Sequence, residues 1–247
     1  MLEDREQIRR NVEEVRRRIA GAATRSGLDP ETVTLVAVTK TVGIERIRSA
    51  VEAGVLAFGE NYVQDLRSKQ EEITGVSWHY IGTLQSSTAH RVADHADVVE
   101  TVAGERAARR LAGRADRSGR TIDALIEVDL TEGRAGVRPD DLAAFADLVG
   151  SLPGLRLIGL MTVPPIPRDP EDSRSSFARL RELRERLQER HPDVLETSMG
   201  MSLDYEVAVE EGATMVRIGT ALFGPRATVT RPRNEPTNGP GDEEGSA

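Results

Sequence analysis

Cysteine is absent from this chain of 247 residues, and aromatic residues make up only 3% of it. The missing cysteine excludes disulfides and thiolate chemistry and leaves the redox compartment open. No apolar run approaches the roughly 20 residues of a transmembrane helix, and the N-terminus, charged from Glu3 onward, lacks the apolar core of a signal peptide. A net charge of −8 argues against a nucleic-acid surface. We therefore expect a cytoplasmic protein that binds neither membranes nor nucleic acids.

Several catalytic and ligand-binding patterns are missing as well. The four histidines, at positions 79, 90, 95 and 191, show no metal-ligand spacing, so we expect no metal site. The sequence has no phosphate-binding Walker loop, no Gly-x-Gly-x-x-Gly after a strand and no serine elbow. These absences exclude the commonest nucleotide-binding and serine-hydrolase sites.

Lysine is rare: the chain has only Lys40 and Lys69, and its other basic residues are arginines. Lys40 follows the apolar, largely β-branched segment Val33–Thr39, which predicts a buried strand of a parallel sheet. The C-terminal ends of such strands carry the chemistry of α/β proteins. A lysine in apolar surroundings can lose its proton and form a Schiff base, whereas arginine stays charged. The alternative is a lysine that simply reaches solvent.

Strand and helix signals alternate along the rest of the chain. Apolar residues at helical spacing predict an amphipathic helix over residues 2–26. Eight strands are predicted, each followed by a helix or helix-like segment: Val33–Thr39, Val55–Phe58, Ser77–Ile81, Asp97–Thr101, Thr121–Leu130, Leu155–Met161, Val194–Ser198 and Thr214–Ile218. Repeated βα units close most naturally as a (β/α)8 TIM barrel, with a doubly wound open sheet as the alternative.

The domain organisation follows from the same pattern. We expect a helix over residues 1–28, packed on a single barrel domain of residues 29–226. Residues 227–247 are rich in proline, glycine and acidic side chains and have almost nothing to bury. We therefore expect this tail to be disordered.

Small residues follow the seventh and eighth strands, where barrels often bind phosphate. Ser202, Gly219 and Thr220 have the properties of a phosphate site, because glycine lets the backbone approach an anion and hydroxyl groups donate hydrogen bonds. The alternative is that the glycines here are ordinary turn residues. A strand-end lysine together with a phosphate site indicates either pyridoxal phosphate (PLP) or a phosphosugar ligand.

Arg217, in the last strand, bears on that choice. An arginine facing a pyridine nitrogen disfavours its protonation and weakens the ring as an electron sink. A phosphate or carboxylate partner elsewhere in the barrel would explain Arg217 equally well.

Six stretches of the sequence, in the same order as in a known family, resemble the motifs of that family. They are Val36–Lys40, Phe58–Gln64, Trp78–Gln85, Gly159–Thr162, Ser198–Ser202, and Val216–Thr220 with Phe223-Gly224. Together they make the chain similar to the pyridoxal phosphate homeostasis protein family, the single-domain relatives of the alanine racemase barrel. The resemblance spans roughly residues 35–226.

The resemblance implies a role for each candidate residue. It makes Lys40 the Schiff-base lysine and Arg217 the partner of the pyridine nitrogen. It also implies that Asn61 lines the pocket and that Ser202, Gly219 and Thr220 bind the phosphate.

The chain departs from the family pattern at three places. Thr39 replaces a common serine, Ser87-Thr88 replaces the usual Asn-Lys, and Arg134 replaces a common lysine. The second departure removes a basic side chain near the mouth of the pocket. It puts in doubt any second cofactor site or transfer role that depends on that lysine.

The family is understood to bind PLP and regulate its supply without robust catalysis, handing it to acceptor enzymes. We therefore assign no catalytic residue and expect a monomer. An amino-acid racemase is the alternative, but two-base racemisation needs a second acid/base opposite the lysine. Related racemases take a tyrosine from an additional domain, which this chain lacks. The remaining alternative, a phosphosugar-binding barrel, would not respond to PLP.

Overall fold

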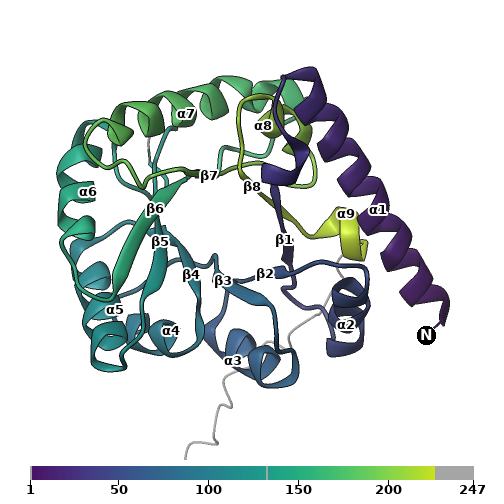
Figure 1. Cartoon of the computed structure of the whole chain (residues 1–247), viewed down its shortest axis with the longest axis horizontal. Helices are drawn as coiled ribbons and strands as arrows, with labels where there is room; N and C mark the ends of the chain where they lie inside the picture. Colours follow the sequence, from purple (N-terminus) through teal and green to yellow (C-terminus); the bar gives the residue numbers. More distant parts are fainter. Residues whose placement is uncertain (1, 132, 226–247) are drawn as a thin grey trace, which may run out of the picture.

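Eight parallel strands form a closed barrel in sequence order in the computed structural model, which describes residues 2–131 and 133–225 (Figure 1). The strands are β1 (Thr34–Val38), β2 (Ala57–Glu60), β3 (Ser77–Tyr80), β4 (Val98–Val102), β5 (Ile122–Glu127), β6 (Leu155–Met161), β7 (Glu196–Ser198) and β8 (Met215–Ile218). β1 pairs with both β2 and β8, which closes the ring. The predicted (β/α)8 barrel is confirmed, and the open-sheet alternative is wrong.

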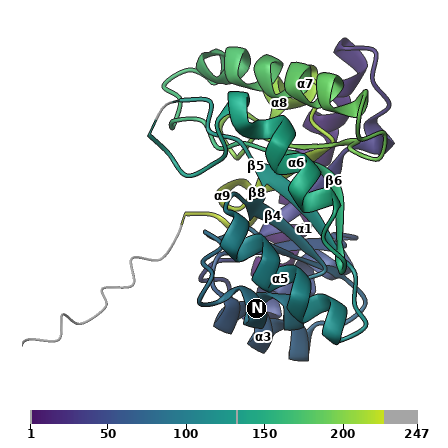
Figure 2. The same ribbon diagram turned by 90° about the vertical axis from the view of Figure 1, so that its left-hand side faces the viewer.

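Helices surround the ring of strands on the outside (Figures 1 and 2). They are α1 (Leu2–Arg25), α2 (Ile44–Glu52), α3 (Val63–Glu72), α4 (Ala89–His95), α5 (Glu105–Arg117), α6 (Leu142–Gly150), α7 (Arg174–Gln188), α8 (Tyr205–Glu210) and α9 (Thr220–Phe223). Short 3-10 turns precede β1, α6 and α7: η1 (Pro30–Thr32), η2 (Pro139–Asp141) and η3 (Pro170–Ser173). Among the described residues, no helix combines the length and apolar character needed to cross a bilayer.

Three strands differ from the predicted bounds by two residues or more: β2, β5 and β7, the last of which begins at Glu196 instead of Val194. Val55 does not begin β2, because a turn with Gly54 at a φ of +84° precedes it and Leu56 is exposed. β5 ends at Glu127 instead of Leu130, because Val128 forms a single bridge to Val137 within the following loop. The short helix α9 follows β8, in agreement with the prediction that each strand leads into a helical segment.

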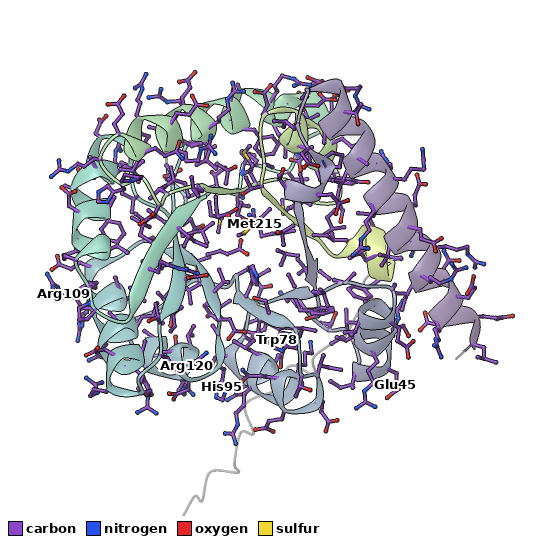
Figure 3. All side chains as sticks on the ribbon, viewed as in Figure 1. Glu45, Trp78, His95, Arg109, Arg120 and Met215 are labelled. Carbon is purple, nitrogen blue, oxygen red and sulfur yellow. The ribbon has the colours of Figure 1, made fainter. Side chains whose placement is uncertain are left out.

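The core has two layers, as the alternation of side chains along barrel strands requires. The larger layer lies between strands and helices and includes Phe58 and Trp78, whose rings are 5.6 Å apart. The smaller layer fills the barrel interior with Val36, Ala57, Val98, Leu125, Met161 and Met215. Figure 3 shows Met215 at the centre of the ring and Trp78 toward the helices.

The extra N-terminal helix α1 lies against α2, α8 and α9 (Figure 1). Its buried residues, Ile8, Val12, Val15 and Ile19, follow the helical spacing seen in the sequence. The domain limits at residues 28 and 226 stay predictions. The tail predicted to be disordered, residues 227–247, lies outside the described residues.

Candidate functional site

Lys40 lies two residues beyond β1, at the C-terminal end of the barrel, and is partly buried. Its Nζ lies 5.1 Å from the centre of the exposed Tyr62 ring, a cation–π contact. Among the described residues it has no hydrogen-bond or ion-pair partner. The next residue, Thr41, has a φ of +65°, which is unfavourable for a β-branched side chain. Such strain collects at functional sites, so the turn at Lys40 is held by its surroundings.

Arg217 lies inside the barrel on β8, which pairs directly with β1, and is only 5% exposed. Its guanidinium donates hydrogen bonds to the Ser198 hydroxyl (2.5 Å) and the Thr162 carbonyl (2.9 Å). Burial lowers the pKa of Arg217, against the opposing effect of nearby carboxylates. The guanidinium is therefore fixed in the barrel below the end of β1 by contacts on two sides.

Glu100 of β4, which was not predicted, is the acidic partner of Arg217. Its Oε2 lies 3.6 Å from the guanidinium and accepts a 2.5 Å hydrogen bond from Ser198, while its Oε1 lies 2.7 Å from Nδ1 of His79. Burial opposes ionisation of this carboxyl, but His79, Arg217 and Ser198 outweigh burial and lower its pKa. The carboxylate partner considered for Arg217 is therefore present inside the barrel.

Ser202, Gly219 and Thr220 meet where the loops after β7 and β8 come together. The Ser202 hydroxyl accepts a hydrogen bond from the Ala221 amide (3.3 Å), in the first turn of α9, which leaves its own proton for another acceptor. A Cβ added to Gly219 would lie 3.3 Å from the Val38 carbonyl oxygen, so this glycine is close to the end of β1. Thr220 is exposed. The three residues therefore lie beside the strand that leads to Lys40.

Asn61 directly follows β2 and is partly buried. Its carbonyl oxygen would be only 2.0 Å from a Cβ added to Gly82, so a glycine is required at the end of β3. All six predicted site residues therefore lie at the C-terminal end of the barrel.

A buried cluster behind Lys40 was missed in the sequence. Lys69 of α3 donates a hydrogen bond to the Thr39 carbonyl (2.7 Å) and forms an ion pair with Glu60. The Thr39 hydroxyl donates to the same Glu60 oxygen at 2.7 Å. Glu60 is fully buried, and its other oxygen has no partner among the described residues. This cluster connects the segment before Lys40 to the segment before Asn61.

Glu127, the last residue of β5, is the other interior carboxylate that was missed. Burial raises its pKa to about 7, although Arg217 and Arg134 act in the opposite direction. One signal could have found both residues: Glu100 and Glu127 are acidic residues in largely apolar strands, β5 also containing Asp123. In a barrel, such positions either face the interior or belong to a site.

Two of the departures from the family pattern lie on loops at this end. Thr88 precedes the first residue of α4, and Ser87 is exposed. Arg134 donates hydrogen bonds to the carbonyls of Val163 (2.6 Å) and Pro164 (2.8 Å). Its guanidinium therefore ties the loop after β5 to the loop after β6.

A cavity of about 1260 Å³ lies at the opposite end of the barrel. It is lined by the first residues of several strands and by α1, and it includes Thr34, Asp123 and His79. None of the predicted site residues lines it. The N-terminal face of such barrels usually serves stability, whereas chemistry occurs at the other face.

The sequence is similar to those of known proteins. The sequence profile described as "Alanine racemase, N-terminal domain" matches residues 4–227. A protein of Pseudomonas aeruginosa named pyridoxal phosphate homeostasis protein is 40% identical over 223 residues, covering 89% of this chain and 96% of the relative. The Escherichia coli K12 protein of the same name is 40% identical over 233 residues, covering 89% and 97%.

Solved structures resemble the chain as well. PipY of Synechococcus elongatus, determined with PLP bound, is 37% identical with a TM-score of 0.74, covering 83% of this chain and all of PipY. Alanine racemase of Clostridium difficile is 15% identical with a TM-score of 0.72 and is covered over 58% of its length. The second likeness concerns the fold alone.

Proposed function

The chain belongs to the alanine racemase N-terminal domain family and, within it, to the pyridoxal phosphate homeostasis proteins, and from this premise we propose that it binds PLP and acts in PLP homeostasis. It holds the cofactor as a Schiff base on Lys40 and has no robust catalytic reaction. The relatives of that name and the PLP-bound PipY support this assignment.

The observation that supports the proposal is the pairing of β1, which leads to Lys40, with β8, which carries Arg217 and leads to Gly219. β1 and β8 are hydrogen-bonded neighbours, and Gly219 lies against the end of β1. An amine, a fixed guanidinium and a backbone open to an anion therefore occupy one end of the barrel. This set matches the aldehyde, the pyridine nitrogen and the phosphate of PLP.

Each residue then has a distinct task. Lys40 supplies the amine. Arg217, held by Ser198 and the Thr162 carbonyl, donates a hydrogen bond toward the ring nitrogen but does not transfer a proton to it. Ser202, Gly219 and Thr220 bind the phosphate, and Asn61 lines the pocket. When bound, the cofactor supplies an electrophilic carbonyl and an electron sink, which an arginine at the nitrogen keeps weak.

The proposal extends to setting and partners. We infer that the protein acts in the cytoplasm as a monomer and passes PLP to acceptor enzymes. A mouth without a covering domain among the described residues leaves Lys40 near solvent, where an acceptor can reach it. The proposed monomeric state can be tested by measuring the hydrodynamic size of the protein at several concentrations, which should not change.

Absorbance spectra with and without added PLP test the cofactor site. We expect the visible band of a Schiff base in the wild type and no such band in Lys40→Ala or in Lys40→Arg, which keeps the charge but lacks a nucleophilic amine. Borohydride reduction should fix the cofactor on the peptide that contains Lys40. Because Lys69 is the only other lysine, peptide mapping separates the two side chains.

A colourless wild type in excess PLP, or a label on Lys69, would contradict the proposal. The same samples distinguish the racemase alternative. Racemisation of alanine or serine at ordinary enzyme rates, lost in Lys40→Ala, would favour an enzyme.

A further inference from the structure

Glu127 faces the inside of the barrel at its C-terminal end. Two residues earlier, Leu125 belongs to the interior cluster, and two residues before that Asp123 lines the cavity at the opposite end. Alternate residues of a strand share one face, so Glu127 is on the same interior face at the end where Lys40 lies. Glu127 is partly buried, and within the described part of the chain its carboxylate has no hydrogen-bond or ion-pair partner.

The charged groups around Glu127 are all engaged elsewhere. From β8, Arg217 donates to Ser198 and the Thr162 carbonyl; from β4, Glu100 contacts His79 and Ser198. In the loop after β5, Arg134 donates to two backbone carbonyls, and Asp129 accepts from the amides of residues 131, 133 and 134. Glu127 is therefore the interior carboxyl at this end that is left for a ligand.

The order of strands places Glu127 opposite Lys40. In the closed ring, β5 is four strands from β1 in either direction. Lys40 follows β1 and Arg217 lies on the adjacent β8, whereas Glu127 lies on β5, so a ligand held by Lys40 and Arg217 would have Glu127 across the barrel interior.

The protonation state of Glu127 matters because PLP is an anion. An ionised carboxylate would repel it, whereas a carboxylic acid can donate a hydrogen bond to it. Burial raises the pKa of Glu127 to about 7, so both forms are present near neutral pH. An incoming anion favours the protonated form further.

We propose that Glu127 is a further cofactor-binding residue, which contacts bound PLP as a neutral acid, so that binding of the cofactor takes up a proton. This inference rests on the proposed function. Binding of PLP should therefore weaken as the pH rises through the neutral range. The contact comes from β5, a strand that neither the motifs nor the comparisons connect with the cofactor.

Equilibrium dialysis of PLP between pH 6 and 8.5 tests this coupling. Glu127→Gln fixes the neutral form, and Asp123→Asn is the matched control, on the same strand and face but at the other end of the barrel. We expect wild type and Glu127→Gln to bind equally at pH 6. At pH values above the pKa of Glu127, the affinity of the variant for PLP should rise relative to that of the wild type by up to about tenfold per pH unit.

Any pH dependence that does not involve Glu127 is common to all three proteins and cancels in the ratio of affinities. Asp123→Asn should follow the wild type. Parallel curves for wild type and Glu127→Gln would overturn the role of Glu127 alone. If none of the three proteins binds PLP, the proposed function fails and this inference with it.

Proton uptake gives a second readout that needs no variant to fold. In weakly buffered solution near pH 7.5, PLP binding to the wild type should take up more protons than binding to Glu127→Gln. Equal uptake would contradict the proposal.

Discussion

Lys69 is the side chain that most directly supports Lys40. It donates to the carbonyl of Thr39, the residue just before Lys40, and its charge is balanced by Glu60. A buried ion pair contributes little by itself, because desolvation offsets the attraction, but loss of one partner leaves an uncompensated charge. The cluster therefore makes the position of the Lys40 turn sensitive to a residue 29 positions further along the chain.

We expect Lys69→Met to destabilise the protein by about 3–5 kcal/mol, since Glu60 would stay buried without a counter-charge. The double variant Glu60→Gln/Lys69→Met should recover much of that loss. Denaturant unfolding measures both. Equal unfolding midpoints for Lys69→Met and wild type would contradict this account of the cluster.

Sequence alone could predict the site residues that lie at strand ends, because parallel strands bring those ends together. Lys40, Asn61 and Gly219 are of this kind. Lys69 could not be predicted, because it reaches Thr39 from the outside of the barrel, through a helix, and no periodic pattern links the two. Glu127 could have been noticed, but its protonation depends on burial and on neighbours from other strands.

Among the elements, α1 packs directly on α9, the helix that begins at Thr220. Its buried face packs on α2, α8 and α9, and Asn11 donates a hydrogen bond to the Leu222 carbonyl (2.8 Å). Ion pairs of Arg18 and Arg25 with Glu206 and Glu210 add to this contact at the surface. Such exposed pairs contribute little, so the apolar face of α1 holds the helix in place.

Ile8 is fully buried on that face, and we expect Ile8→Ala to cost about 2–4 kcal/mol of unfolding free energy through the cavity it leaves. Arg10→Ala, an exposed position of the same helix, should change stability by less than about 0.5 kcal/mol. Thermal or denaturant unfolding of the two variants measures both stability losses. Similar losses would mean that burial on α1 does not matter.

The order and type of the larger elements were predictable from hydrophobic periodicity, and the amphipathic pattern of α1 gave its length almost fully. The displaced start of β2 was not predictable, because Val55 and Leu56 resemble strand residues. The turn at Gly54 and the hydrogen bond from Val55 to Ala50 override that propensity.

For the whole molecule, the raised pKa of Glu127 links pH to stability. Its carboxyl ionises near pH 4.5 in the unfolded chain and near 7 in the folded one. Folding therefore favours the neutral form of Glu127. The stabilisation that this group contributes to the folded state is complete below pH 4.5 and is lost as the pH rises through 7.

Without cofactor, Glu127→Gln should therefore gain stability relative to wild type between pH 5 and 8, by up to about 3 kcal/mol before solvent screening reduces it. Denaturant unfolding at each pH measures the difference, with Asp123→Asn as control. A difference that stays constant with pH would contradict the raised pKa.

The position of α1 also has a consequence for synthesis on the ribosome. This helix is synthesised before the barrel strands, yet its partners in α8 and α9 and the strand that closes the barrel on β1 are made some 200 residues later. Until then only α2 is available to cover part of its apolar face, and exposed apolar surface favours aggregation. A nascent chain therefore completes the packing of α1 and closes the barrel in the same late event.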